Sequence, residues 1–274
     1  MAGRQAARRK LRRAFVSAAL DNENYQPNLL QTETCKTMPQ SKIFDDAKAA
    51  LFDLKDGVSL MSGGFGLCGI PENCITEIVS KGAKNIHAIS NNIGNSGKGL
   101  AQLLKHKQIT SATCTYVGGN PDLEEQMLAG EVDVTLVPQG TFSERIRAAG
   151  MGIRAFFTPA GYGTLVAEGK EVREFDRPCI LELPLHADFA IIKAQKGDSY
   201  GNLWFKETAR NFSPLMGMAA RTTVVEVEEL VQLGDIPAED VHLPGVFVQR
   251  IFQGSDYENT IEIPIYAENE SPAG

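Results

Sequence analysis

The stretch "LMSGGFGLCGIPENC", residues 60–74, determines how the rest of this sequence is interpreted. Residues 64–69 form a literal G-x-G-x-x-G, which lies between an apolar run and a helix predicted to begin at Pro71. In a dinucleotide-binding turn such glycines let the backbone approach a pyrophosphate, and the N-terminus of the following helix faces it. The motif alone therefore raises the hypothesis of a nucleotide site.

A dinucleotide site also needs an acidic residue about 20 positions after the glycines, where it binds the ribose hydroxyls. Here the next predicted strand, residues 86–90, is followed by Asn91 and Asn92, and no acid occurs between Glu77 and Asp122. The glycine motif therefore lacks the acidic residue that a dinucleotide site requires. Two interpretations remain for the loop: a glycine-rich turn that holds no ligand, or a concavity of backbone N–H groups suited to an anion or a thioester carbonyl.

Predicted strands and helices alternate regularly from Ser41 to Gly150. The first helix is predicted to start at Ser41 as N-cap and to stop at Gly57, with one apolar face. Alternation of this kind indicates βαβ units, so we predict an α/β fold with a mainly parallel (mixed) central sheet and helices on both faces. The predicted strands are 58–61, 86–90, 112–119 and 132–140, and the predicted helices are 41–57, 71–81, 100–107, 121–130 and 141–150.

The pattern changes after Gly150. Residues 155–178 are glycine-rich and poor in helix signals, which predicts loops and short hairpin strands. Two strands joined by a turn are predicted over 188–205, and another strand over 222–230. Residues 259–274 are polar and are predicted not to pack. The predicted organisation is a basic and polar extension over 1–37, one domain over 38–255, and a polar C-terminal tail over 256–274.

Composition is that of an ordinary globular protein, with 43% hydrophobic and 22% charged residues. No run of about 18 to 20 apolar residues occurs, which argues against a membrane span. Five cysteines without a C-x-x-C pair indicate free thiols and a reducing compartment. The net charge is −7; residues 1–37 carry seven Lys or Arg and three acids, which leaves 20 against 31, or −11, for the remainder. An acidic body argues against nucleic acid as a partner.

The basic N-terminal segment has three interpretations. Six cations precede the first acid, Asp21, and an Arg-rich, acid-poor composition is typical of a mitochondrial presequence. Few serines occur there, and the polar stretch 21–37 behind it favours an extension ahead of a natural start at Met38. A functional basic arm is the third interpretation.

Two further loops follow predicted strands. Asn91 and Asn92 open the glycine-rich loop 90–99, where adjacent amides either fix a ligand's polar atoms or serve as turn residues. Gln139 and Gly140 follow a strand expected to be buried, at the edge where open α/β sheets bind ligands. The amide of Gln139 is either a plain loop amide or a donor to an oxyanion.

Motifs for several other chemistries are absent from the sequence. It contains no G-x-S-x-G elbow, no Walker A loop and no H-E-x-x-H. Cysteines and histidines do not follow metal-ligand spacing, so no metal site is predicted. Cys68 and Cys74 are expected to be small buried residues rather than nucleophiles. No residue of the chain stands out as a nucleophile.

Taken together and in order, these segments resemble the α half of the family I coenzyme A transferases, in particular those of the 3-oxoacid type. The similarity runs from about Lys42 to about Gly254. It rests on "DGVSLMSGGFGLCGIP" (56–71), "SNN" (90–92), "YVG" (116–118), "LAGEV" (128–132), "PQGT" (138–141), "ERIRAAG" (144–150), "FFTPAGYGTLVAEGKEVREF" (156–175), "ARNF" (209–212) and "TTVVEVEELV" (222–231).

The resemblance implies transfer of coenzyme A from succinyl-CoA to a 3-oxo acid such as acetoacetate, by ping-pong chemistry through a glutamate. In the family that glutamate lies in the β half, within a Ser-Glu-Asn-Gly motif that this sequence lacks. A β subunit is therefore the implied partner, in an α2β2 heterotetramer. Coenzyme A is implied as a substrate, with no permanently bound cofactor, no metal, no nucleic acid and no membrane.

Residue roles also follow from the resemblance. Gln139 matches the family's oxyanion donor, and Asn91 and Asn92 match a loop near the reacting carboxylate. The loop beside coenzyme A matches Gly63, Gly64, Phe65, Gly66, Leu67, Cys68 and Gly69.

Three alternatives in function stay open on the sequence alone. A related transferase would use acetate, butyrate or 3-oxoadipate as acceptor. A non-catalytic module would bind a CoA ester or a sugar phosphate. An NAD-binding oxidoreductase would bind dinucleotide tightly. A separate α chain is the arrangement associated with bacteria, which favours the cytoplasm; the mitochondrial matrix is the alternative if residues 1–37 are a presequence.

Overall fold

The computed structural model describes residues 41–95 and 97–261. The chain divides into two units, Met1–Gln40 and Ser41–Gly274, and everything below concerns the described part of the second. The three interpretations of residues 1–37 lie outside the described residues, as do the start at Met38 and the tail beyond Ile261.

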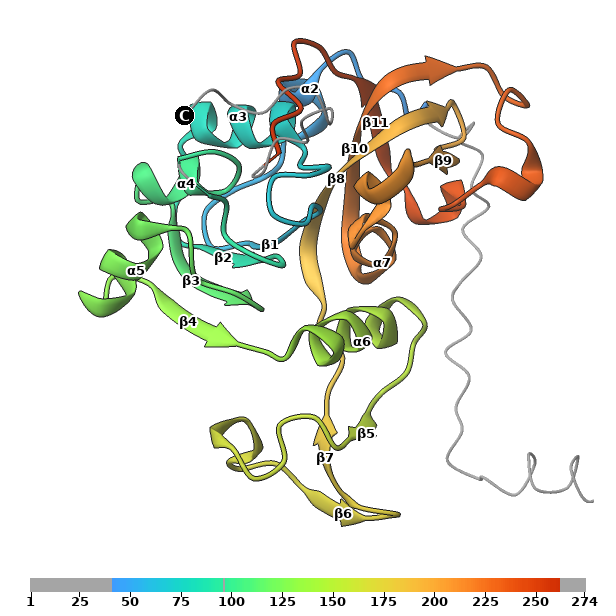
Figure 1. Cartoon of the computed structure of the whole chain (residues 1–274). Coiled ribbons are helices and arrows are strands. Elements are labelled where there is room, and N and C mark those ends of the chain that lie inside the picture. Colours follow the sequence, from blue (N-terminus) through green and yellow to red (C-terminus); the bar gives the residue numbers. More distant parts are fainter. Residues whose placement is uncertain (1–40, 96, 262–274) are drawn as a thin grey trace, which may run out of the picture. The chain divides into compact units, whose positions relative to one another are not determined.

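A large sheet with the strand order β11-β10-β8-β1-β2-β3-β4 organises this unit (Figure 1). Neighbouring strands along this path are parallel, and one short strand, β9, pairs antiparallel with β8. The predicted mainly parallel, mixed sheet is therefore confirmed. The strands are β1 (Ser59–Ser62), β2 (Ile86–Ile89), β3 (Ile109–Cys114), β4 (Asp133–Leu136), β8 (Ala187–Asp198), β9 (Leu203–Trp204), β10 (Ala220–Val231) and β11 (Arg250–Gln253).

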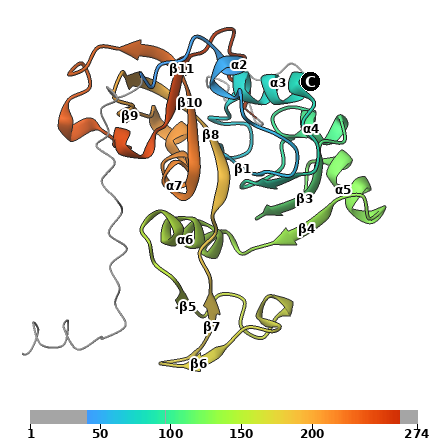
Figure 2. The same ribbon diagram turned by 180° about the vertical axis from the view of Figure 1, so that it is seen from behind.

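Helices cover both faces of the sheet, as predicted (Figures 1 and 2). One buried apolar cluster joins α2, α3, α4 and α5 to the sheet, and a second joins α6 and α7 to it. Consecutive strand residues point to opposite faces, so Leu60 and Met61 of β1 belong to different clusters. The helices are α2 (Ala47–Ala50), α3 (Glu72–Lys81), α4 (Ala101–Lys105), α5 (Pro121–Leu128), α6 (Gln139–Gly150) and α7 (Ser213–Ala219).

Two local predictions are wrong. The helix expected over 41–57 is a single turn, α2, capped by Asp46 rather than Ser41. Ile43 lies instead in a parallel bridge with Ile251 of β11. The N–H of Phe44 donates to the Ile251 carbonyl and the Ile251 N–H donates to the Lys42 carbonyl, both at 2.8 Å, so strand pairing satisfies these backbone groups as a helix would. The strand before Gln139 is not buried: β4 is the edge of the sheet, and its residues are mostly exposed.

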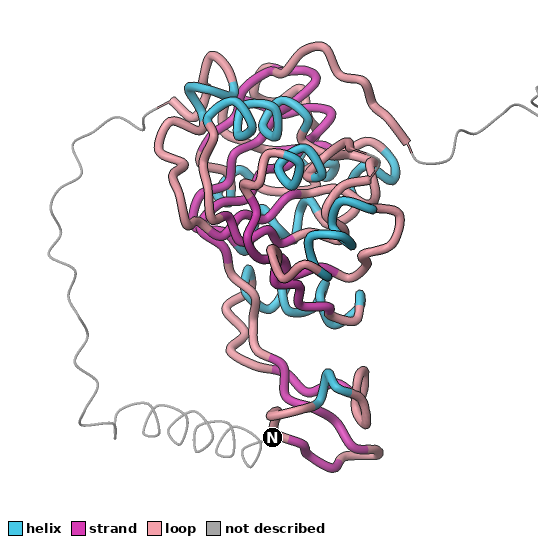
Figure 3. The backbone as a smooth tube through the Cα atoms, turned by 90° about the vertical axis from the view of Figure 1, so that its left-hand side faces the viewer, coloured by secondary structure: helices cyan, strands magenta, loops and turns pink. Residues whose placement is uncertain are grey.

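The segment after α6 forms a small antiparallel sheet with the order β5-β7-β6, which stands apart from the large sheet in Figure 3. This confirms the prediction of short hairpin strands. Arg145 of α6 lies 3.8 Å from the buried carboxylate of Glu182 in β7, which ties this sheet to α6. Lys170 pairs with the same carboxylate at 2.6 Å from within the small-sheet segment. The remaining elements are β5 (Phe156–Thr158), β6 (Val172–Glu174), β7 (Pro178–Glu182), η1 (Leu165–Ala167), η2 (Glu207–Arg210), η3 (Ala238–Asp240) and η4 (Gly245–Phe247).

The described part of the C-terminal tail packs, contrary to expectation. Ser255 exchanges hydrogen bonds of 2.9 and 3.0 Å with the side chain of Asn73. The backbone N–H groups of Glu258 and Asn259 donate to the carboxylate of Glu72 at 2.9 and 3.0 Å. Residues 255–261, called the C-terminal strap below, therefore lie against the start of α3.

Two features of the described residues bear on the earlier predictions. The four cysteines among the described residues, Cys68, Cys74, Cys114 and Cys179, are free thiols, as expected. Over 41–95 and 97–261, no helix is long and apolar enough to cross a membrane.

Candidate functional site

The predicted site residues follow three strands of the parallel sheet at the carboxyl edge. The glycine loop, residues 63–69, follows β1; Asn91 and Asn92 follow β2; and Gln139 follows β4. Ser90 donates its hydroxyl to the carbonyl of Ser62 at 2.8 Å, which joins the ends of the first two strands. This edge is where open α/β sheets bind ligands.

The glycine loop is held from several directions. Gly63 N–H donates to the carbonyl of Ile191 on β8 at 3.0 Å, and Phe65 and Cys68 exchange backbone bonds of 3.1 and 3.0 Å. Asn211 acts as a bracket: its Oδ1 accepts from Gly64 N–H at 3.1 Å, and its Nδ2 donates to the carbonyl of Cys68 at 3.1 Å. The loop therefore has a fixed shape without a ligand.

Two glycines in the loop are required by their surroundings. Gly69 has φ +71°, and a Cβ there would lie 2.7 Å from the carbonyl oxygen of Ala209. Gly64 has φ +121°, and a Cβ would lie 2.7 Å from a methyl group of Ile70. Left-handed backbone and close approach both favour glycine. The G-x-G-x-x-G pattern therefore serves packing against η2 and the segment leading to α3.

The geometry does not suit a pyrophosphate. Of the seven N–H groups of residues 63–69, those of Gly63, Gly64, Phe65 and Cys68 donate within the protein. The N-terminus of α3, which would face the phosphates in a dinucleotide site, is already occupied by the carboxylate of Glu226. The rejection of the dinucleotide hypothesis is thus supported, but a cradle of free N–H groups is wrong for these four positions.

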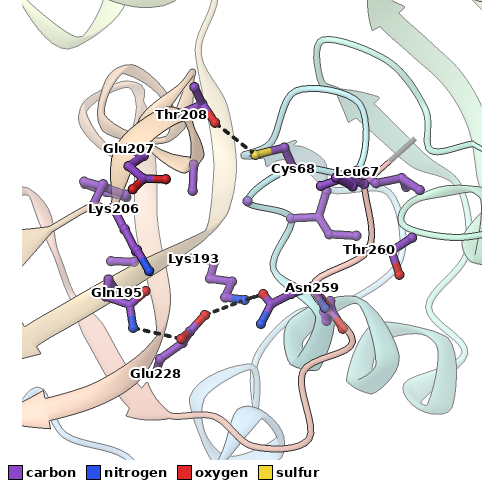
Figure 4. A pocket seen from close by; sticks show the side chains of 17 residues that line it. Leu67, Cys68, Lys193, Gln195, Lys206, Glu207, Thr208, Glu228, Asn259 and Thr260 are labelled. Atoms are coloured by element: carbon purple, nitrogen blue, oxygen red, sulfur yellow. Dashed lines mark hydrogen bonds and ion pairs between the residues drawn. The ribbon is translucent and has the colours of Figure 1, made fainter. Parts of the chain in front are cut away.

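A cavity of about 380 Å³ opens beside the glycine loop (Figure 4). Leu67, Cys68 and Gly69 form one wall, and residues of β8, β10, η2 and the C-terminal strap form the others. Figure 4 shows Cys68 facing Thr208 across the cavity, and their Sγ and Oγ1 atoms are 3.6 Å apart. This cavity brings the loop together with groups that are far away in sequence.

Two charged groups of the cavity wall, Lys193 and Glu228, form an ion pair. Lys193, which is 6% exposed, lies 3.0 Å from Glu228 and donates to Oδ1 of Asn259 in the strap. Gln195 donates to the same carboxylate of Glu228 at 2.8 Å. Burial raises the pKa of Glu228, while its bonds from Lys193 and Gln195 outweigh this and hold the pKa below its ordinary value. The cavity wall is therefore polar without a large excess of either charge.

Gln139 and Asn91 are brought into contact. Gln139 Nε2 donates to Asn91 Oδ1 at 2.8 Å, and Thr115 Oγ1 donates to the same oxygen at 3.0 Å. Asn91 is buried, whereas Gln139 is exposed at the first position of α6. An amide nitrogen carries two N–H groups, and the bond to Asn91 uses one of those of Gln139. Asn92 contacts this pair, accepting from Asn91 Nδ2 at 3.3 Å.

A row of aromatic rings links the two parts of the site. Phe65 of the glycine loop stacks on Phe212 with ring centroids 6.5 Å apart, and Phe212 meets the edge of Phe142 at 5.6 Å. Phe142 lies on α6, three positions after Gln139. The loop and the start of α6 are therefore connected by a row of packed rings, of which Phe212 and Phe142 are buried.

Several residues at the site were missed from sequence. The stretch 209–212 contributed to the family resemblance, but nothing local assigned Asn211 as the bracket of the glycine loop; its φ of +21° is a strained value for a non-glycine residue. Lys193, Glu226 and Asn259 reach the site only through the fold. No sequence signal marks such long-range partners.

Burial shifts the pKa of two groups behind the glycine loop, the Cys74 thiol and the Glu226 carboxyl group. Burial is the main cause that raises the pKa of the Cys74 thiol, with Glu226 adding to it. Burial likewise raises the pKa of Glu226 to about 7, against the N–H groups of Cys74 and Asn73, which lower it. Among the residues that the structure describes, no group of three or more potential ligands is placed to hold a metal ion.

Fold and site together define an α/β protein with a shaped glycine loop and an amide donor at the carboxyl edge of a parallel sheet. Residues 44–254 match the model of the coenzyme A transferase family. The chain belongs to the coenzyme A transferase family, and it contributes CoA-transferase rather than oxidoreductase chemistry.

Individual relatives agree with this assignment. The chain is 50% identical over 223 residues to one subunit of the succinyl-CoA:3-ketoacid coenzyme A transferase of Helicobacter pylori, covering 81% of this chain and 96% of that protein. It is 43% identical over 255 residues to the human mitochondrial succinyl-CoA:3-ketoacid coenzyme A transferase 2, covering 86% of this chain but 49% of that one. An acyl-CoA transferase of Escherichia coli shares the fold, with a TM-score of 0.72 at 19% identity over 80% of this chain and 48% of that one.

Proposed function

We propose that this chain is the α subunit of a 3-oxoacid coenzyme A transferase that moves coenzyme A from succinyl-CoA to a 3-oxo acid such as acetoacetate. The observation that carries the proposal is the 50% identity to one subunit of a transferase named for that reaction, over nearly the whole length of the relative. The fit of the site supports it, since the glycine loop and the amide pair lie together on one edge of the sheet.

In this proposal, the glycine loop 63–69 holds the thioester region of acyl-CoA. The cavity beside it has a mixed polar and apolar lining with one buried ion pair, Lys193–Glu228, and acids on it that outnumber its lysines, which suits a neutral amide-bearing chain better than a phosphate. The free N–H of Gln139 donates to the oxyanion that forms when the thioester carbonyl is attacked. Asn91 fixes the Gln139 amide, and Asn91 and Asn92 lie near the reacting carboxylate.

A partner β subunit is proposed to supply the nucleophile. Its glutamate carboxylate attacks the thioester carbonyl and CoA thiolate leaves, which gives an acyl anhydride. The thiolate then attacks the glutamyl carbonyl and releases succinate, leaving a glutamyl-CoA thioester, and the acceptor acid reverses these steps. Covalent relay divides one difficult exchange into easier ones. Coenzyme A is a substrate here, and no permanently bound cofactor takes part.

Assembly and location complete the proposal. The human relative is about twice as long as the matched segment, which is what a chain carrying both halves would show. We propose an obligate heteromer with a β subunit, in an α2β2 arrangement. The cytoplasm is the proposed location, with the mitochondrial matrix as the alternative if residues 1–37 are a presequence.

The experiment measures acetoacetyl-CoA formation from succinyl-CoA and acetoacetate, with this chain alone and then with a candidate β subunit present. Activity only in the mixture supports the proposal. Activity of the chain alone would contradict the division of labour. A panel of acetate, butyrate and 3-oxoadipate in place of acetoacetate tests the acceptor, and a strong preference for one of them would change the proposed substrate.

A further inference from the structure

Helix α3 follows the glycine loop directly, yet its own sequence supplies no cap. Pro71 occupies the N-cap position and makes no side-chain bond to the first turn. The N–H groups of Asn73 and Cys74 donate instead to Oε1 and Oε2 of Glu226, at 3.3 and 2.8 Å. Glu226 lies on β10, about 150 positions later in the chain. The fold therefore supplies this cap from a distant strand.

Glu226 is fully buried, with 0% of its surface exposed. Three titratable groups act on it: Cys74 from α3, Lys193 from β8 and Tyr257 from the C-terminal strap. On its other side its partner in β11 is the apolar Phe252. Burial raises the pKa of the carboxyl group to about 7. A carboxylate in such surroundings is stabilised chiefly by the two N–H groups, since water does not reach it.

The position of Glu226 bears on both ends of the glycine loop. One end is fixed to β8, where Gly63 N–H donates to the Ile191 carbonyl. The other end passes through Ile70 and Pro71 into α3. Strands β8 and β10 are neighbours, and Glu226 lies opposite Lys193 in their register. Both ends of the loop are therefore tied to the same pair of strands, one by the backbone and one by Glu226.

We propose that Glu226 is a positioning residue for CoA transfer: by capping α3 from β10, it sets where the glycine loop stands against β8 and so how acyl-CoA is held. The inference rests on the proposed role of the loop in holding acyl-CoA. Glu226 itself does not touch the substrate, because its carboxylate is enclosed by α3, β8 and the strap.

The test compares Glu226→Gln, Glu226→Ala and Glu229→Gln, each in the assembled complex with the β subunit. The glutamine keeps the volume and one acceptor oxygen, but its NH₂ faces a backbone donor; the alanine removes both acceptors. Glu229 is the matched control, since it lies on the same strand with its carboxylate in an exposed ion pair with Lys196. Two readouts are taken below the unfolding temperature: amide hydrogen exchange by mass spectrometry, and kcat/KM for succinyl-CoA.

We expect faster exchange confined to residues 63–76, with residues 86–136 unchanged. We expect kcat/KM to fall about tenfold for Glu226→Gln, the size of one lost buried hydrogen bond, and further for Glu226→Ala. Glu229→Gln should match the wild type in both readouts. Exchange that rises evenly over the whole sheet, or a folded Glu226→Gln complex with unchanged exchange and kcat/KM, would overturn the proposal.

The experiment also distinguishes two other outcomes, a Glu226→Gln variant that does not fold and a wild-type complex without transferase activity. If Glu226→Gln does not fold, Glu226→Asp, which keeps the charge with a shorter reach, is measured by the same readouts and the same criteria. If the wild-type complex transfers no coenzyme A, the proposed function fails, while the exchange measurement still decides whether Glu226 positions the loop.

Discussion

The glycine loop and the Asn91–Gln139 pair lie at the same edge of one sheet, but they are built in opposite ways. The loop is closed: four of its seven N–H groups (Gly63, Gly64, Phe65 and Cys68) donate within the protein. Gln139 is open, exposed at the start of α6 and held by one bond of 2.8 Å. The difference supports the proposal that the loop provides shape, whereas the Gln139 amide provides a donor to the substrate.

Replacing Gln139 by alanine should have the largest kinetic effect. Loss of one oxyanion donor lowers turnover by about 10²-fold, while the free energy of unfolding should change little because the side chain is exposed. Steady-state kinetics of the assembled enzyme measures this effect. Gln232→Ala, which changes an exposed glutamine after β10, is the control. Unchanged turnover in Gln139→Ala would reduce Gln139 to a loop amide and remove the contrast between the two regions.

Gly69→Ala should lower the free energy of unfolding, whereas Gln139→Ala should lower mainly turnover. Gly69 and Gly82 share φ +71°, but a Cβ at Gly69 meets the Ala209 carbonyl at 2.7 Å, whereas Gly82 has open space around it. Both variants bear the strain of left-handed backbone, about 1 kcal/mol, and only Gly69→Ala adds overpacking of about 1–3 kcal/mol. Denaturant unfolding of both variants measures the difference. Equal losses would show that the loop is not tightly fitted against η2.

The pH dependence of the free energy of unfolding reports on Glu226, the buried residue that caps α3 behind the glycine loop. The folded-state pKa of Glu226 is raised from 4.5 to about 7 by burial. Between these values the folded chain keeps a proton that the unfolded chain has released, so this group's contribution to the free energy of unfolding falls as pH rises from about 4.5 to about 7. In Glu226→Gln the side chain is an amide, which does not titrate in this pH range, so this variant lacks the pH-dependent contribution.

Unfolding experiments at several pH values test this linkage. The wild type minus Glu226→Gln difference in the free energy of unfolding should decrease across the window and then level off above pH 7. A difference that is flat or that grows with pH would mean that the carboxyl group of Glu226 is not buried as described. It would also contradict the account in which Glu226 on β10 holds the end of the glycine loop.

The smallest effect is expected for Phe65→Leu. Phe65 is 51% exposed and stacks on Phe212, and an aromatic pair of this kind contributes about 0.5–1.5 kcal/mol. Phe52→Leu is the control, because Phe52 is similarly exposed and its ring lies 4.6 Å from the Arg250 guanidinium, away from the loop. Similar losses of stability are expected, with kcat/KM for acyl-CoA lowered only in Phe65→Leu. An equal kcat/KM for both variants would remove the Phe65 ring from the site.

Much of the fold could be predicted because its signals are local. Apolar strands separated by helices with clear stops, such as α3 ending at Gly82, mark βαβ units in any single sequence. The short first helix could not be predicted in this way. Its apolar spacing fits a helical face, but Ile43 is drawn into pairing beside β11, which lies about 200 positions later.

The candidate site was found from sequence through signals that are local in the same way, and the roles of its residues stay predictions. Glycine spacing and the amides after β2 and β4 identified the loops, because these signals lie within a few residues of each strand end. The contacts that hold the loops come from Asn211, Lys193 and Glu226, which sequence alone cannot place beside Gly63 or Cys74. The exposure of β4 was also unpredictable, because an apolar strand at a sheet edge looks the same in sequence as one in the centre.

The most direct test is intact-mass spectrometry of both chains of the assembled complex after exposure to succinyl-CoA without an acceptor. We expect a covalent coenzyme A adduct on a glutamate of the partner β chain, with none on this chain. An adduct on this chain, at a carboxylate of the cavity wall such as Glu207 or Glu228, would contradict the proposed division of labour and make this chain the carrier of the nucleophile.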